Sequence, residues 1–275
     1  MEGIFPAGAD RSEVEALNKQ RAVLLERLYR IHGVSIWDVY DESGIGQERN
    51  ALAKEFVTNG SSVLDVGTGR GYFAFACARR GSRVTAVDIM DGDQRVGWWK
   101  VFAECSLRLG VGKKVGMIRA SASRLPVEPR VFETVTCVHA MRNFLAPGEL
   151  KEAIREMYRT TARGGKLVLV ESVAKPESGA EEVYLAYLRL RKALGWETGI
   201  PEATDLELSL KRAGFSEITS TTRRFSRDYA PVEFPSYSVS DRAPEIKEEH
   251  RRIEKMRLRY GIRAPPVAVV SGVRF

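Results

Sequence analysis

The feature that most constrains this chain is a series of short apolar runs separated by stretches of helical periodicity. The runs begin after Ser61 and lack the polar alternation of a strand with one solvated face. Uninterrupted apolar strands are typical of a parallel sheet that helices cover on both sides. The sequence therefore predicts an α/β fold with a wound sheet. We expect strands at 63–66, 84–87, 115–118, 135–138 and 167–170, and helices near 71–80, 93–110 and 148–163.

Further segments surround this core. Apolar spacing predicts a helix over 11–32 and another near 47–56. After Glu171 we expect a helix at 181–194 that is apolar over much of its circumference, and a helix at 204–213 that ends at Gly214. Two more strands, at 219–227 and 267–275, and a charged helix at 245–260 complete the prediction.

The glycine run after the first predicted strand is the candidate ligand loop. Gly67, Gly69 and Gly71 alternate with other residues between that strand and the next helix. Glycine allows a sharp turn and a close approach of the backbone to a ligand. The N-terminus of the following helix offers unpaired N–H groups and a partial positive charge. In a wound sheet such a loop lies at the carboxyl ends of the strands, where ligands bind.

Two acidic residues indicate what this loop binds. The glycine spacing differs from the GxGxxG of dinucleotide-binding proteins, and the chain contains no GxxxxGK[ST] loop. Asp65 would repel a pyrophosphate but suits an amino group. Asp88, 21 residues after Gly67, ends the second predicted strand, where a carboxylate can bind both hydroxyls of a ribose. A nucleoside that carries an ammonium group fits both sites, and S-adenosylmethionine has this description.

These residues resemble the class I S-adenosylmethionine-dependent methyltransferases. The resemblance covers roughly residues 60–172 and has the general look of the branch with ubiquinone/menaquinone-type and sterol-type enzymes. It rests on four motifs that occur in order along the chain. The first is the glycine run with Asp65, and the second is Asp88 at the end of the next strand. The third is Arg124-Leu125-Pro126 followed by 131–135, and the fourth is the Arg163-Gly164-Gly165 turn that leads into 166–170.

The resemblance implies a Rossmann-like sheet of seven strands in the order 3-2-1-4-5-7-6, with strand 7 antiparallel and formed by 267–275. It also implies S-adenosylmethionine as cofactor. Ser121 stands where the family commonly has Asp. The residues implied in cofactor binding are Asp65, Gly67, Thr68, Gly69 and Gly71 for the methionine part, Asp88 for the ribose, Ile89, Ser121 and Ala122 for the adenine, and His139 as a further contact.

The candidate catalytic residues are His139 and Tyr40. His139 follows the fourth predicted strand, where the family places the methyl group, and an imidazole can act as a general base. Tyr40, together with Trp37, lies in an aromatic segment that can cap the site, and Arg49 can neutralise a carboxylate. The segment after the fourth strand lacks the [DNS]PP[YFW] of base-amine methyltransferases and an Asp for magnesium. We therefore predict no metal.

The methyl acceptor has two candidate classes. The apolar helix at 181–194 favours a small or lipid-like molecule. The alternative is RNA (tRNA or rRNA), because residues 222–263 contain 11 basic and 7 acidic residues. Glutamates and arginines at helical spacing between 248 and 257 favour a solvated face instead. A non-catalytic S-adenosylmethionine-binding module is a third hypothesis.

Length, charge and cysteine content limit what can be expected of the location and domain organisation of the chain. The chain has 275 residues and a net charge of +7, its three cysteines form no CxxC, and no run approaches the roughly 18 apolar residues of a membrane-spanning helix. We expect a cytoplasmic protein, and its oligomeric state stays open. The predicted organisation is an N-terminal helical cap at 1–59, a wound cofactor-binding core at 60–228 with a lid-like helix at 181–194, and a helical insertion with the final strand at 229–275.

Overall fold

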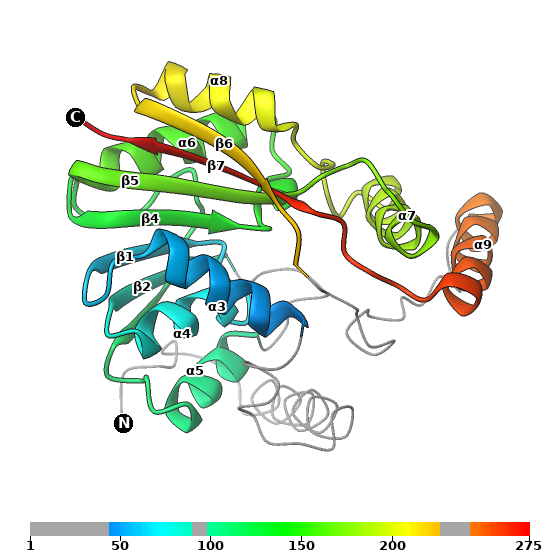
Figure 1. The fold of residues 1–275 in the computed structure, drawn as a ribbon, viewed down its shortest axis with the longest axis horizontal. Coiled ribbons are helices and arrows are strands. Elements are labelled where there is room, and N and C mark those ends of the chain that lie inside the picture. The colour runs from blue at the N-terminus through cyan, green and yellow to red at the C-terminus, as the bar shows by residue number, and fades with distance from the viewer. Residues whose placement is uncertain (1–43, 90–97, 226–242) are drawn as a thin grey trace. The chain divides into compact units, whose positions relative to one another are not determined.

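A computed structural model describes residues 44–89, 98–225 and 243–275 (Figure 1). Seven strands within this part form one sheet in the order β3-β2-β1-β4-β5-β7-β6. Strand β7 (Val267–Val273) runs antiparallel to both β5 and β6. The predicted fold class, strand order and strand direction are confirmed. The helix predicted at 11–32 lies outside the described residues.

The chain divides into two compact units, one ending at Ser121 and the other beginning at Ala122. The strands of the first unit pair in parallel, β1 with β2 and β2 with β3. Residues 63, 64 and 66 of β1 are completely buried, which explains why this strand lacks polar alternation. The described elements of this unit are α3 (Gly44–Phe56), β1 (Ser62–Val66), α4 (Tyr72–Arg79), β2 (Arg83–Asp88), α5 (Trp98–Arg108) and β3 (Val115–Arg119).

The second unit begins with two parallel strands, β4 and β5, and continues through the antiparallel pairs that β7 forms. Helix α8 packs on β6 and β7, and α6 packs on α8 and on β5. The described elements that precede β7 are β4 (Phe132–Val138), the 3-10 turn η1 (Met141–Asn143), α6 (Glu149–Thr160), β5 (Thr161–Ser172), α7 (Gly179–Ala193), α8 (Ala203–Ala213), β6 (Ser216–Arg223) and α9 (Pro244–Tyr260).

The boundary between α6 and β5 lies earlier than predicted. The helix ends at Thr160 instead of 163, and β5 begins at once because Thr161 adopts an extended backbone with φ −65° and ψ 131°. The Thr161 hydroxyl donates to the carbonyl of Met157 at 2.6 Å. The buried Arg274 side chain donates to three main-chain carbonyls at this helix end, at 2.5, 2.9 and 2.9 Å. These contacts satisfy the carbonyls that a helix C-terminus leaves unpaired.

Strand β6 also differs from its prediction. It covers 216–223 instead of 219–227, and residues 226 and 227 lie outside the described part. Helix α8 ends as expected, with Gly214 in the left-handed conformation at φ 104°.

Helix α7 and helix α9 lie side by side in the second unit (Figure 1). Tyr184, Tyr187 and the other apolar residues of α7 form a buried cluster with Ile253 of α9 and with Ile262 and Ala264. Packing against α9 therefore buries part of the apolar circumference of α7. The apolarity of this helix is then no argument by itself for a lipid-like acceptor.

None of the described helices has the length and apolar character needed to cross a membrane. The boundaries predicted at 59/60 and 228/229, and the role of 181–194 as a lid, stay predictions.

Candidate functional site

The glycine loop of the first unit follows β1 directly. The main-chain N–H groups of Gly67 and Thr68 both donate to the carbonyl of Val87 in β2, at 2.7 and 3.1 Å. The φ angles of Gly67, Gly69 and Gly71 are 73°, 55° and 86°. A side chain is strained at these angles, so glycine is the favoured residue at all three positions.

Gly71 has a second constraint, which is lack of space. A Cβ atom built at this position would lie 2.5 Å from the ring of Phe75 and 2.6 Å from that of Phe102. Both rings are almost completely buried, and their centroids are 4.7 Å apart. Gly71 also precedes the first residue of α4, so the N-terminus of that helix opens onto the loop.

Asp88 connects the loop to the end of β2. The main-chain N–H of Gly69 donates to Asp88 Oδ2 at 2.8 Å. Ile89, the next residue, is 44% exposed, so its apolar side chain is accessible beside the loop. The N–H of Ala120 donates to the Asp88 carbonyl at 3.2 Å, so Ser121 follows closely on the same edge. The first unit thus brings Asp88, Ile89 and Ser121 together beside the loop.

Asp65 and Thr68 add polar groups to this edge. Asp65 is 1% exposed, and burial together with the Asp65 charge raises the pKa of the Cys77 thiol well above its usual range. The hydroxyl oxygen of Thr68 is buried and has no hydrogen-bond partner among the described residues. A buried hydroxyl without a partner is costly unless a bound molecule completes it. This loop therefore fits a ligand with polar groups.

His139 of the second unit follows β4 and has a strained backbone. Its φ is 55°, and its main-chain N–H donates to the carbonyl of Val170 at 2.8 Å. Its Nδ1 lies 3.2 Å from Oε1 of Glu171, which ends the adjacent strand β5. The His139 and Glu171 side chains are 6% and 1% exposed. Left-handed backbone is uncommon at a non-glycine residue and often occurs at functional sites.

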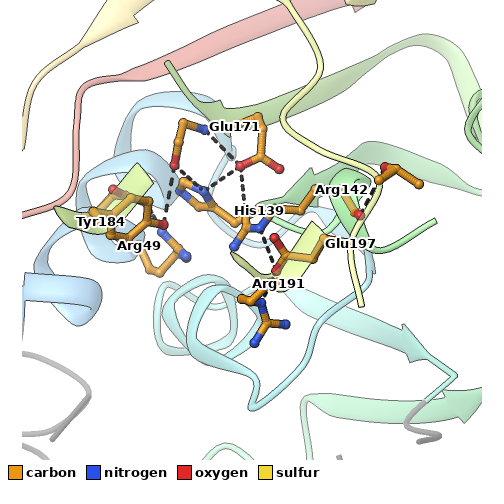
Figure 2. Close-up of polar contacts among 10 residues, drawn as sticks. Arg49, His139, Arg142, Glu171, Tyr184, Arg191 and Glu197 are labelled. Atoms are coloured by element: carbon orange, nitrogen blue, oxygen red, sulfur yellow. Dashed lines mark hydrogen bonds and ion pairs between the residues drawn. The ribbon is translucent and has the colours of Figure 1, made fainter. Parts of the chain in front are cut away.

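A chain of alternating charges continues from Glu171 (Figure 2). Arg142 Nη1 donates to Glu171 Oε1 at 2.5 Å, and Arg142 Nε lies 3.3 Å from Glu197 Oε1. Arg191 Nε donates to the same Glu197 oxygen at 2.5 Å. We call His139, Arg142, Glu171, Arg191 and Glu197 the histidine network.

The predicted site residues fall in both units. Asp65, the glycine loop with Thr68, Asp88, Ile89 and Ser121 belong to the first unit, whereas Ala122, which is buried, and His139 belong to the second. Tyr40 and Trp37 lie outside the described residues. The Arg49 guanidinium pairs with Glu48 of its own helix.

Sequence reasoning missed four members of the histidine network, which are Arg142, Glu171, Arg191 and Glu197. One indication was present for Glu171. It follows the apolar run at 167–170 as His139 follows the run at 135–138, and neighbouring parallel strands end at one edge of a sheet. Within the described residues, no three His, Cys, Asp or Glu side chains form a group that could hold a metal ion.

Three arginines of α9 have acidic partners on the same helix. Arg251 pairs with Glu248, Arg252 with Glu249, and Arg257 with Glu254, each three residues apart. These pairs confirm that glutamates and arginines between 248 and 257 pair at helical spacing. They also reduce the positive charge that α9 offers to a polyanion.

Comparison with known proteins gives the family. Residues 64–169 match a family of methyltransferase domains. A demethylmenaquinone methyltransferase from Thermobifida fusca is 28% identical over 201 residues, which cover 72% of this chain and 68% of that protein. A ubiquinone/menaquinone biosynthesis C-methyltransferase, UbiE, from a Marinomonas species is 31% identical over 153 residues, 54% of this chain and 57% of that protein.

The solved structures support the fold. The YcgJ protein from Bacillus subtilis has a TM-score of 0.60 at 16% identity, and the match covers 83% of this chain and 98% of that one. Several curated relatives match over only about half of their own length.

Proposed function

Since residues 64–169 form a class I S-adenosylmethionine-dependent methyltransferase domain, we propose that this protein methylates a ring carbon of a reduced quinone. S-adenosylmethionine is the methyl donor of this family. The observation that supports donor binding most directly is the hydrogen bond from Gly69 to Asp88, which holds the glycine loop against the end of β2. The acceptor class is supported by the relatives, whose names refer to demethylmenaquinone and to C-methylation.

The residues of the first unit suit the donor. We assign the amino group of the methionine part to Asp65 and the loop, with Thr68 as the hydroxyl that the ligand completes. Asp88 contacts the ribose, exposed Ile89 flanks the adenine, and Ser121 with Ala122 lies at its edge. When bound, S-adenosylmethionine supplies a methyl group activated by its sulfonium.

His139 acts as the general base in this proposal. It accepts the proton of a ring hydroxyl, and the electron pair released makes the neighbouring ring carbon nucleophilic. Overall, one ring C–H bond and the S–CH3 bond break, a C–CH3 bond forms, and one proton is released. Tyr40 is kept as a predicted contributor on the evidence of sequence alone.

RNA is the less favoured acceptor because three α9 arginines, Arg251, Arg252 and Arg257, have glutamate partners in the described structure. We also propose that the domain boundaries lie at 59/60 and 228/229 and that residues 181–194 form a lid over the site, as the sequence predicts.

The test uses isotopically labelled S-adenosylmethionine with reduced 1,4-naphthoquinone as acceptor. We expect a product one methyl group heavier, labelled on a ring carbon, and at least a tenfold weaker donor affinity for Asp88→Ala in calorimetry. Bulk tRNA serves as the competing acceptor. Label in tRNA with none in the quinol, or no donor binding at millimolar concentration, would contradict the proposal.

A further inference from the structure

We infer that Glu171 is a positioning residue, which fixes the tautomer of His139 so that Nε2 carries the lone pair. This inference rests on the proposed function, because it explains how His139 becomes a base. It concerns a residue that the chemistry of methyl transfer does not by itself require. The contacts of Nδ1, the charge balance around Glu171 and the backbone of His139 support it in turn.

Nδ1 of His139 lies beside a carboxylate and a hydroxyl. Glu171 Oε1 lies 3.2 Å from this nitrogen and also accepts the main-chain N–H of Ser172 at 2.9 Å. An ionised carboxylate only accepts hydrogen bonds, so Nδ1 must carry the hydrogen for this contact to form. The Ser172 hydroxyl lies 3.5 Å from Nδ1 and 3.5 Å from the hydroxyl of Tyr184. In the neutral ring, Nε2 is then the basic nitrogen.

Charge balance keeps the ring neutral at rest. A buried carboxylate with no other cation nearby would draw a proton onto the histidine. Here Arg142 already compensates Glu171 at 2.5 Å, and Arg191 compensates Glu197 on the far side of Arg142. The network thus contains two carboxylates and two guanidinium groups, which balance without a proton on His139. Arg142 from η1 contacts Glu171, Glu197 from the segment after α7 contacts Arg142, and Arg191 from α7 contacts Glu197.

The backbone of His139 holds the ring in place. Its left-handed φ of 55° is anchored by the hydrogen bond to Val170, which precedes Glu171. The same two strand ends therefore fix both the main chain of the histidine and the carboxylate that its ring contacts. Strained backbone of this kind persists only where the surrounding structure determines it.

Nitrogen NMR of ¹⁵N-histidine-labelled protein tests the inference without an acceptor. The chain has three histidines, so His32→Gln and His250→Gln variants assign the His139 signals. We expect the Nδ1–H form in the unsubstituted protein near pH 8. Glu171→Met, which removes the acceptor and leaves Arg142 paired with Glu197, should shift the ring towards the Nε2–H form. Glu197→Gln is the matched control, because Glu197 is also buried and its ion pairs are with Arg142 and Arg191.

The outcomes separate this inference from the proposed function. An Nε2–H form in the unsubstituted protein overturns it, even if Glu171→Met fails to fold. An unchanged tautomer in folded Glu171→Met, or an equal shift in Glu197→Gln, also overturns it.

Activity with reduced 1,4-naphthoquinone gives the second measurement. Glu171→Met should lower kcat by roughly 10²–10³-fold with the KM for S-adenosylmethionine unchanged, and should cause no further loss in a His139→Ala background. Additive losses would contradict the positioning role. If the unsubstituted protein methylates no quinol, the proposed acceptor fails while the tautomer measurement still decides the role of Glu171.

Discussion

The glycine loop and the histidine network are built in opposite ways, one from a single continuous segment and the other from side chains of several elements. The loop is continuous in sequence, from Gly67 to Gly71, and is held mainly by main-chain hydrogen bonds. The network joins side chains from β5, η1, α7 and the segment after α7, and holds them by charge. The loop should therefore be sensitive to added volume, and the network to the loss of a single charge.

The largest effect is expected from Arg142→Met, which tests the network. This change leaves Glu171 without its cation while both carboxylates stay buried, and an uncompensated buried charge costs about 3–5 kcal/mol of unfolding free energy. Arg155→Met is the control, because its pair with Glu152 is half exposed and should be worth less than about 1 kcal/mol. Urea denaturation measures both variants. Equal losses would show that burial of the network has no energetic consequence.

Gly71→Ala tests the loop and should cost about 2–4 kcal/mol. The new methyl group meets two buried phenylalanine rings, and its φ of 86° adds strain. Gly110→Ala separates these causes, because Gly110 has φ 68° but no atom within 4 Å of an added Cβ. We expect about 1–2 kcal/mol for Gly110→Ala, with donor binding retained. A loss at Gly110 as large as that at Gly71 would mean that φ strain, and not volume, limits the loop.

Thr68→Val separates binding from stability within the loop. Its hydroxyl is buried without a described partner, so its removal should leave the unfolding free energy unchanged or slightly higher. Donor affinity should fall about tenfold if the ligand completes this hydroxyl. Thr161→Val is the opposite control, because that hydroxyl already donates to Met157. It should lose about 1 kcal/mol of stability and keep its donor affinity. Unchanged affinity in Thr68→Val, measured by calorimetry, would exclude this hydroxyl from the donor site.

The same contrast explains what the sequence could predict. The loop was predictable because its information is local, with an apolar strand, three glycines at fixed spacing and an acidic residue after the next strand. Strand order followed from the resemblance, and the structure confirms it. Only His139 of the network was found, because charge partners such as Arg142 and Glu171 are 29 residues apart and have no fixed spacing. Glu197 stands in a segment without periodicity, where nothing predicts burial.

The apolar helix at 181–194 shows the same limit. Its composition predicted an apolar helix, and Tyr184 and Tyr187 of this helix are buried in the structure. It did not show that α9, some 60 residues later, packs against this helix. The sequence of α9 predicts a charged helix with few apolar positions, so nothing in it indicates this contact. Periodicity therefore predicts that a face is buried, but the identity of the covering element depends on tertiary contacts.

The smallest effect concerns the dependence of stability on pH, and His250 on α9 supplies it. Burial lowers the pKa of His250 from its usual 6.5, and its Nε2 has no hydrogen-bond partner among the described residues. The unfolded chain therefore binds this proton more readily, so stability should fall as pH drops below about 6.5 and level off beneath the lowered pKa. His250→Gln should remove this part of the slope between pH 7.5 and 5.5 in urea denaturation. An unchanged slope would show that His250 does not contribute to the acid sensitivity of the fold.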